Sequence, residues 1–329
     1  MDFQNFFKIA EESLKTGNPE ILNTFEPKKE ILREPVKKLF IRSAILVSGD
    51  KIKHLKKIVE RDVDIIIFNL EDGVSDKNKP IARKILKIFL SNINPENKQI
   101  VVRLNPIDSS FFFDDICEIL PAIPHGIRLS KVETPEDVIA LDKIITAFEK
   151  KIGIRENTIK IHLSIETGKS IQNLKEILQS SKRIETAYLG ILDLFSDLKL
   201  PQSAIKTSPT AKFLKANFVT TCRSYNVYPV APAYQNYKDL EGFEKECMED
   251  KIIGFSGKSC ISIKQTEIAN LIFSPSEEEI EKARKIVELY KKAEEKGEGG
   301  ITFNGLFIDQ PIYKDALNIL KLSGTLNEI

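Results

Sequence analysis

The sequence predicts a (β/α)8 barrel with a C-terminal helical arm and a short N-terminal helical extension. Apolar runs rich in β-branched residues alternate with amphipathic helical patterns, which is typical of a parallel sheet buried on both faces. Eight such runs lie between residues 39 and 258, the number that a (β/α)8 barrel requires. No G-x-G-x-x-G or Walker sequence follows any of them, which disfavours the alternative, a doubly wound open sheet.

Residues 1–38 form the predicted N-terminal extension. Phe3, Phe6, Phe7, Ala10 and Leu14 recur at helical spacing before the break at "TGNP", so one face of this helix is apolar. We expect that face to pack on the helix's own domain, and keep a docking helix for another protein as the alternative.

The barrel is expected over residues 39–275. Its eight strand candidates are "LFIRSAILV", "VDIIIFNL", "KQIVVRLN", "HGIRLSKV", "IKIHLSI", "IETAYLGIL", "VYPVAPA" and "KIIGFSGK". Residues 276–329 form the predicted arm, with a helix that opens at "SPSEEE", a short extended piece and a final helix.

Composition limits the classes of function. The 49 Lys and Arg residues balance 48 Asp and Glu residues, so the formal net charge of +1 argues against a protein that binds nucleic acid. The four cysteines form no C-x-x-C pair, no apolar run is long enough to span a membrane, and the start lacks the pattern of a signal peptide. We therefore expect a soluble cytoplasmic protein.

Charged residues cluster where the predicted strands end, which is where barrel enzymes place their chemistry. These strand-end residues are Glu71, Asp72, Arg103, Lys131, Glu133, Glu166, Asp193 and Lys258. Two interpretations stay open: the charges neutralise one another, or Glu166 and Asp193, on neighbouring strands, hold a magnesium ion. The histidines show no metal-ligand spacing and no G-x-S-x-G sequence occurs, so proton transfer is left to carboxylates, Lys, Tyr or water.

Nine ordered stretches between Arg42 and Ile319 resemble a known family. They are "RSAILVSGD", "NLEDGVSDKNKPIAR", "VVRLN", "RLSKVET", "LSIETGKSIQN", "YLGILDLFSDL", "GFSGKSCISIKQ", "FSPSEEEIEKA" and "GLFIDQPIYKDAL". The chain is similar to the HpcH/HpaI aldolase and citrate lyase superfamily, and within it to the citrate lyase β subunit-like acyl-CoA lyases.

That resemblance implies a (β/α)8 barrel whose arm reaches the active site of a neighbouring subunit in a homotrimer or homohexamer. It also implies roles for individual residues. Mg²⁺ ligands are expected at Glu166 and Asp193, and substrate contacts at Arg42, Arg103, Lys131 and Gly168. Catalytic residues are expected at Arg103, at Glu71 and Asp72, acidic residues near the metal, and at Asp309, an acid or base from the neighbouring subunit.

The implied reaction is Mg²⁺-dependent cleavage of a short 3-hydroxyacyl-CoA, of the citryl, malyl or citramalyl type, into an acyl-CoA and a 2-oxo acid, or the reverse condensation. Several positions differ from the family's usual residues, namely Ser48, Asn69, Ser130, Ala231 and Ser262. Because these differences bear on substrate identity, two alternatives remain: a CoA-independent, metal-dependent 2-oxo acid aldolase and a non-catalytic scaffold.

Overall fold

The computed structural model describes residues 1–27, 41–303 and 305–325. The chain divides into two compact units, Met1–Ala269 and Asn270–Ile329. The division falls inside helix α11 (Ile263–Phe273), a few residues before the predicted boundary at 275.

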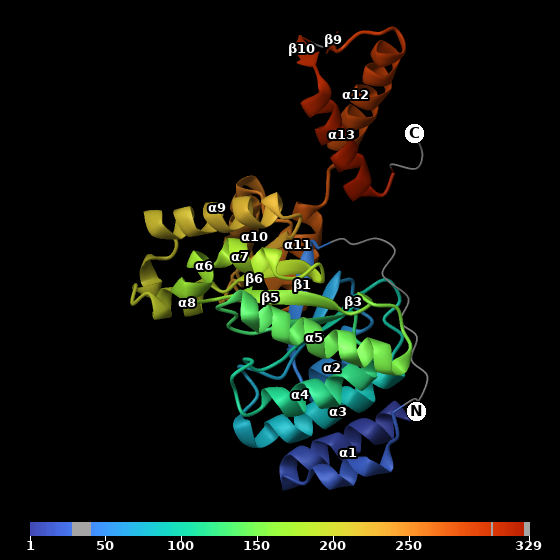
Figure 1. Ribbon diagram of the computed structural model, residues 1–329, viewed down its shortest axis with the longest axis vertical. Helices are drawn as coiled ribbons and strands as arrows, with labels where there is room; N and C mark the ends of the chain where they lie inside the picture. Colours follow the sequence, from blue (N-terminus) through green and yellow to red (C-terminus); the bar gives the residue numbers. More distant parts are fainter. Residues whose placement is uncertain (28–40, 304, 326–329) are drawn as a thin grey trace. The chain divides into compact units, whose positions relative to one another are not determined.

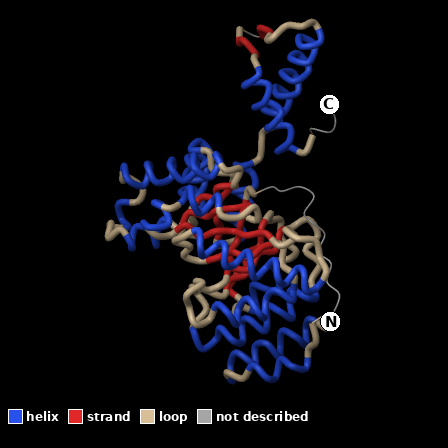
Figure 2. The backbone as a smooth tube through the Cα atoms, viewed as in Figure 1, coloured by secondary structure: helices blue, strands red, loops and turns tan. Residues whose placement is uncertain are grey.

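The first unit contains a closed barrel of eight parallel strands that neighbour one another in sequence order, which confirms the predicted fold. Helices surround the strands (Figure 2). The strands are β1 (Ser43–Ser48), β2 (Ile65–Asn69), β3 (Gln99–Arg103), β4 (Gly126–Leu129), β5 (Lys160–Ile165), β6 (Ile184–Leu189), β7 (Tyr228–Ala231) and β8 (Gly257–Cys260).

Each strand is followed by at least one α-helix before the next strand begins (Figure 1). The barrel helices are α2 (Ile52–Ile58), α3 (Lys79–Asn92), α4 (Phe112–Ile119), α5 (Pro135–Ile152), α6 (Gly168–Gln172), α7 (Leu174–Gln179), α8 (Ile191–Asp197), α9 (Pro209–Ser224), α10 (Leu240–Ile253) and α11. This βα repeat places all the carboxyl ends of the strands at one end of the barrel.

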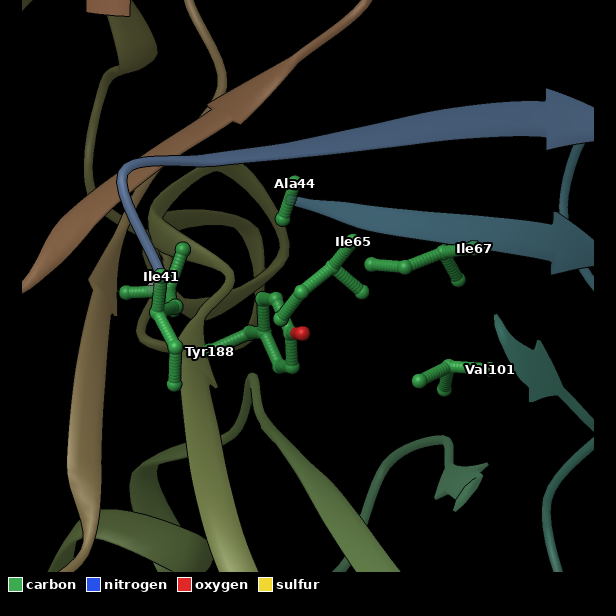
Figure 3. Close-up of a cluster of buried hydrophobic side chains, with 7 residues drawn as sticks. Ile41, Ala44, Ile65, Ile67, Val101 and Tyr188 are labelled. Atoms are coloured by element: carbon green, nitrogen blue, oxygen red, sulfur yellow. The ribbon is translucent and has the colours of Figure 1, made fainter. Parts of the chain in front are cut away.

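Alternate residues of the strands point into the barrel and fill it. Ile65, Ile67, Val101 and Tyr188 belong to one buried apolar cluster inside the barrel (Figure 3). Since the side-chain period of a strand is two, the residue two positions after Val101, Arg103, shares its inward direction.

The N-terminal helix α1 (Phe3–Thr16) packs on the barrel's own helices, as expected. The rings of Phe3 and Phe7 lie 6.0 and 5.8 Å from the ring of Phe89 in α3, and Phe6 is fully buried. The apolar stripe is therefore used within its own unit. The rest of the predicted extension, residues 28–38, and the start of the first strand candidate lie outside the described residues.

The eighth strand differs from the prediction. Residues 251–253 of "KIIGFSGK" are the last turn of α10, which ends at Gly254 in the left-handed conformation with φ of 105°. A glycine ends a helix in this way at little steric cost. Strand β8 begins only at Gly257, so Lys258 stands near its amino end and not at its carboxyl end.

The second unit has a core of its own. Helices α12 (Glu277–Glu295) and α13 (Gln310–Ser323) pack together, and Tyr290 stacks on Tyr313 at a ring distance of 4.4 Å. The predicted extended piece is an antiparallel pair, β9 (Ile301–Phe303) with β10 (Leu306–Ile308). Over the described residues of the whole chain, no helix is long and apolar enough to cross a membrane.

Candidate active site at the carboxyl ends of the strands

Glu71 lies directly after β2 and is almost completely buried, at 2% exposure. Its Oε2 lies 2.8 Å from Nη2 of Arg103, the last residue of β3, and its Oε1 lies 3.4 Å from Nζ of Lys131. Three side chains that the sequence placed at successive strand ends are thus in direct contact. These two cations compensate the buried carboxylate, which would otherwise be costly.

Asn69 organises this corner of the site. Its Oδ1 accepts hydrogen bonds from Nε of Arg103 at 2.7 Å and from the amide of Glu71 at 3.1 Å, while its Nδ2 donates to the carbonyl of Asp72. An aspartate could accept the first two bonds but could not donate the third. Asn69, one of the positions that differ from the family's usual residues, therefore fixes both the turn and the guanidinium.

Glu71 and Asp72 carry opposite pKa shifts. Burial alone raises the pKa of Glu71, but the charges of Arg103 and Lys131 and the hydrogen bond from the Asp72 amide outweigh it, so the pKa lies below its ordinary value. For Asp72, burial and the negative charge of Glu71 raise the pKa. Glu71 is therefore a fixed anion, and Asp72 is the one that takes up a proton more readily.

Lys131 is held in an uncommon backbone conformation. Its φ of 49° is in the left-handed region, which costs a residue with a Cβ roughly 1 kcal/mol. The hydroxyl of Ser130 donates to the carbonyl of Leu104 at 2.7 Å and ties this loop to the end of β3. The strained turn directs the lysine toward Glu71.

A second carboxylate, Glu166, follows β5 and is 2% exposed. Its side chain lies against Gly190, the residue after β6: a Cβ built on Gly190 would come within 3.1 Å of the Glu166 carboxyl carbon. Asp193 is three residues beyond Gly190, in the first turn of α8, so the two carboxylates proposed as a pair follow the neighbouring strands β5 and β6.

The donors present fit a hard divalent cation. Oε2 of Glu166 is buried and accepts no hydrogen bond from any described residue, although a buried carboxylate oxygen ordinarily has a partner. Burial raises the pKa of Glu166 despite the nearby Arg128 and Arg103. No group of three or more His, Cys, Asp or Glu side chains that could hold a metal occurs among the residues described, but Mg²⁺ commonly takes only one or two protein carboxylates.

Gly168 starts helix α6 beside this carboxylate pair. Its amide donates to Oδ2 of Asp197 at 2.7 Å, so a protein carboxylate already interacts with the backbone group that was expected to hold a substrate carboxylate. An anionic ligand that used this amide would take the place of Asp197.

Two sequence-based predictions are corrected. Arg42 precedes β1, at the amino end of the barrel, where its guanidinium forms two hydrogen bonds to Asp64 of 2.9 and 2.7 Å; it is therefore not a substrate residue at the mouth. Lys258 is fully buried and its Nζ lies 2.5 Å from Asp250 and 2.6 Å from Glu246 in α10. It points outward to the helices because inward and outward positions alternate along β8.

The sequence reasoning missed Arg128 in β4. It is 4% exposed, and its Nη2 lies 3.8 Å from Oε1 of Glu166. Arg128 stands in register with the inward-facing Arg103 and therefore shares its direction, a relationship that only the structure shows. Lys79 was also missed; its Nζ donates to the carbonyls of Leu70 and Glu71 and so supports the Glu71 turn.

Asp309 belongs to the second unit, where it is the N-cap of α13 and its Oδ1 accepts from the amide of Ile312 at 3.4 Å. Of the remaining positions that differ from the family's usual residues, Ser262 accepts from the amide of Gln265 at the start of α11, and Ala231 is a fully buried residue at the end of β7.

Fold and site together define a (β/α)8 barrel protein with buried carboxylates and two arginines at the carboxyl ends of its strands. The family model of the HpcH/HpaI aldolase/citrate lyase family matches residues 42–262. The chain belongs to this family.

Curated relatives support this family assignment. The chain is 31% identical over 280 residues to the citrate lyase subunit beta of Haemophilus influenzae, with 85% of this chain and 96% of that protein covered. It is 28% identical to the L-malyl-CoA/beta-methylmalyl-CoA lyase of Rhodobacter capsulatus, with 82% and 90% covered.

Solved structures share the fold. A citrate lyase from Burkholderia xenovorans LB400 superimposes with a TM-score of 0.75 at 19% identity and covers 91% of this chain and 95% of its own. The CitE protein of Mycobacterium tuberculosis, in complex with magnesium, acetoacetate and coenzyme A, gives a TM-score of 0.68 at 21% identity, with 86% and 97% covered.

Proposed function

We propose that this protein is a magnesium-dependent carbon–carbon lyase that cleaves a short 3-hydroxyacyl-CoA into an acyl-CoA and a 2-oxo acid, or catalyses the reverse condensation. The observation that carries this proposal is the Glu166 carboxylate, which is 2% exposed and has one oxygen, Oε2, without a hydrogen-bond partner among the described residues. The names of its relatives, citrate lyase subunit beta and malyl-CoA lyase, support the same reaction class.

Glu166 and Asp193 would hold the ion, which when bound polarises the oxo group of the 2-oxo acid. Cleavage removes the proton of the C3 hydroxyl and breaks the C2–C3 bond, and the electron pair of that bond passes to the thioester enolate, which is then protonated. Arg103 is placed to stabilise the negative oxygen that develops at C3. Its guanidinium is held by Asn69 and Glu71, so little reorganisation is needed during the reaction.

We assign the proton transfer to Asp309 from a neighbouring subunit, on the basis of the resemblance in "FIDQP". This requires a homo-oligomer, for which we propose a trimer or hexamer. One carboxylate oxygen of Asp309 accepts a hydrogen bond as the N-cap of α13, and this bond fixes the orientation of the side chain. Lys131 and Gly168 are the proposed contacts for the acyl and carboxylate parts of the substrate. Asp72, in the turn after β2, is proposed as a further proton acceptor besides Asp309.

The direct test is a cleavage assay of the purified protein with citryl-CoA, malyl-CoA and citramalyl-CoA, in Mg²⁺ or in EDTA. We expect Mg²⁺-dependent release of a 2-oxo acid from one of the three, lost in Arg103→Ala. Metal binding without release from any thioester would contradict the lyase proposal and favour a CoA-independent aldolase. Absence of both metal binding and thioester cleavage would favour a non-catalytic scaffold.

Mixing two inactive variants tests the neighbour's contribution. Arg103→Ala lacks the arginine and Asp309→Asn lacks the acid or base, so an oligomer that contains both variants rebuilds some complete sites if the two residues come from different subunits. We expect activity to return when the variants are dissociated and reassembled together. No recovery, with mixed oligomers demonstrated by mass spectrometry, would place both residues in the same subunit's site.

A further inference from the structure

Arg128 is a second arginine near the mouth and has no part in the proposed bond cleavage. It stands in β4, and its Cα is in register with those of Arg103 on β3 and His162 on β5. Its side chain nevertheless reaches Ser164 in β5 and Glu166 just after β5, two and four residues beyond His162. A strand advances about 3.3 Å per residue, so the guanidinium extends toward the carboxyl end of the barrel, where the candidate cation site lies.

The guanidinium is fixed on three sides. Its Nε donates to Oγ of Ser164 at 2.8 Å, its Cζ lies 4.0 Å from the ring centroid of Tyr188, and its Nη2 is 3.8 Å from Oε1 of Glu166. The hydroxyl of Tyr188 is in turn 3.1 Å from Nδ1 of His162, and this contact holds the Tyr188 ring in place. A side chain held in this way has lost its rotamer freedom before any ligand binds.

One group of this arginine remains without a partner. Nη1 is buried and forms no hydrogen bond with any residue that the structure describes, while the residue as a whole is 4% exposed. Leaving a buried donor unpaired costs about 1 to 3 kcal/mol. Such a group in a preformed site indicates an acceptor that is supplied by a ligand.

Stability alone does not explain an arginine here. Burial and the neighbouring Arg103 both work against its charge and lower the pKa of Arg128 to about 10, which still leaves it charged at neutral pH. An apolar cluster lies in the same barrel interior, and replacing buried charges by apolar groups is often neutral or favourable. Two adjacent guanidinium groups are suited to an anion with more than one carboxylate.

We infer that Arg128 is a substrate-binding residue that takes a second carboxylate of the 2-oxo acid, so that the site selects dicarboxylic over monocarboxylic 2-oxo acids. The inference rests on the proposed function, because it assumes that a 2-oxo acid binds beside Glu166. Arg103 faces the reacting oxygen and Arg128 sets the preference at the other end of the same small molecule.

Oxaloacetate and pyruvate are a matched pair of probes because they differ only by the second carboxylate. Their dissociation constants are measured in Mg²⁺ by calorimetry on wild type, Arg128→Met and Arg128→Lys. We expect wild type to bind oxaloacetate at least about tenfold more tightly than pyruvate, a free-energy difference of about 1.4 kcal/mol. At saturating Mg²⁺, Arg128→Met is expected to bind the two ligands with equal affinity, and Arg128→Lys to retain part of the preference.

Ser164→Ala covers the case in which Arg128→Met fails to fold, since it keeps the arginine and removes only its Nε acceptor; it should lower the preference for oxaloacetate by a few-fold. An unchanged preference in the folded variants, or an equal loss for both ligands and Mg²⁺, would show that Arg128 only supports Glu166 and would overturn the inference. If wild type binds Mg²⁺ and neither 2-oxo acid, the proposed function fails together with the inference; if it binds both equally, the inference alone fails.

Discussion

The carboxylate of Glu166 rests on the backbone of Gly190. The two residues follow neighbouring strands, and the amide of Gly190 donates to the carbonyl of Ile165, directly before Glu166, at 2.9 Å. A Cβ at position 190 would overlap Cγ of Glu166 and come within 3.3 Å of its Cβ. The absence of a side chain at residue 190 therefore sets the position of the proposed metal ligand.

Gly190→Ala is expected to weaken Mg²⁺ binding by about ten- to a hundredfold, the usual effect of disturbing a group that supports a metal ligand. The measurement is a calorimetric Mg²⁺ titration, with the unfolding transition recorded to show that the fold is kept. Gly299→Ala is a suitable control, because no atom lies within 4 Å of a Cβ built there. Equal Mg²⁺ affinity in Gly190→Ala and wild type would show that Glu166 is not a ligand.

Metal removal should lower stability by mass action. At a Mg²⁺ concentration 100 times the dissociation constant, the free energy of unfolding is expected to exceed its value in EDTA by about 2.7 kcal/mol. Asp193→Asn should show little of this difference, because it removes one of the two proposed ligands. Urea denaturation with and without EDTA measures both. A full Mg²⁺ effect in Asp193→Asn would exclude Asp193 as a ligand.

Lys258 is a structural residue, so its loss should affect stability and leave ligand binding intact. Lys258 and Asp250 are both fully buried, and removing one partner of a buried pair costs about 3 to 5 kcal/mol. Lys258→Met is compared with Lys245→Met, which breaks an exposed pair with Glu241 and should leave the free energy of unfolding almost unchanged. Normal stability in Lys258→Met, with weaker Mg²⁺ or 2-oxo acid binding, would indicate that Lys258 belongs to the candidate site at the barrel mouth.

Phe6 tests whether the N-terminal helix is part of the barrel unit. The ring is fully buried and lies 5.3 Å from the rings of Phe7 and Phe25. Phe6→Ala should lower the free energy of unfolding by about 3 to 5 kcal/mol. Phe213, 66% exposed, provides the control. A negligible effect of Phe6→Ala in denaturant unfolding would indicate that the helix is not docked, which would revive the alternative of a docking helix for another protein.

Asp142 should make part of the stability pH-dependent. Burial raises its pKa, but hydrogen bonds from Ser181 and Arg183, each 2.6 Å long, outweigh this and leave the pKa below its ordinary value. A carboxyl group with a lowered folded-state pKa contributes stability above its unfolded pKa, about 3.9, and loses that contribution as the pH falls through the folded-state pKa.

Asp142→Asn should therefore be less stable than wild type at pH 7, and the gap should close in the acid range. Because the carboxylate is 29% exposed, we expect a gap of only about 1 kcal/mol. Urea denaturation at several pH values between 7 and 3 measures it. A gap that stays constant over that range would mean that the Asn side chain is disfavoured for a reason other than charge.

The order of the chain's elements was predictable from its sequence. The alternation of apolar runs with amphipathic segments predicted the eight-stranded barrel, because strands covered by helices on one face and packed inside on the other must be apolar throughout. The clustering of Glu71, Arg103 and Lys131 was predictable for a related reason, since parallel strands bring their carboxyl ends to one edge. The eighth strand was misplaced because an apolar helix end and a short strand have the same composition over a few residues.

Tertiary structure decided which charged residues share the mouth. Arg42 and Lys258 occur in apolar runs of the same kind as those that carry the site residues. The direction of each strand and the alternation of its side chains nevertheless place Arg42 against Asp64 and Lys258 against Asp250. Arg128 was hidden in the sequence because one arginine within a short strand carries no mark of the face it occupies. The register between β3, β4 and β5 determines that face, and register depends on contacts between segments far apart in the chain.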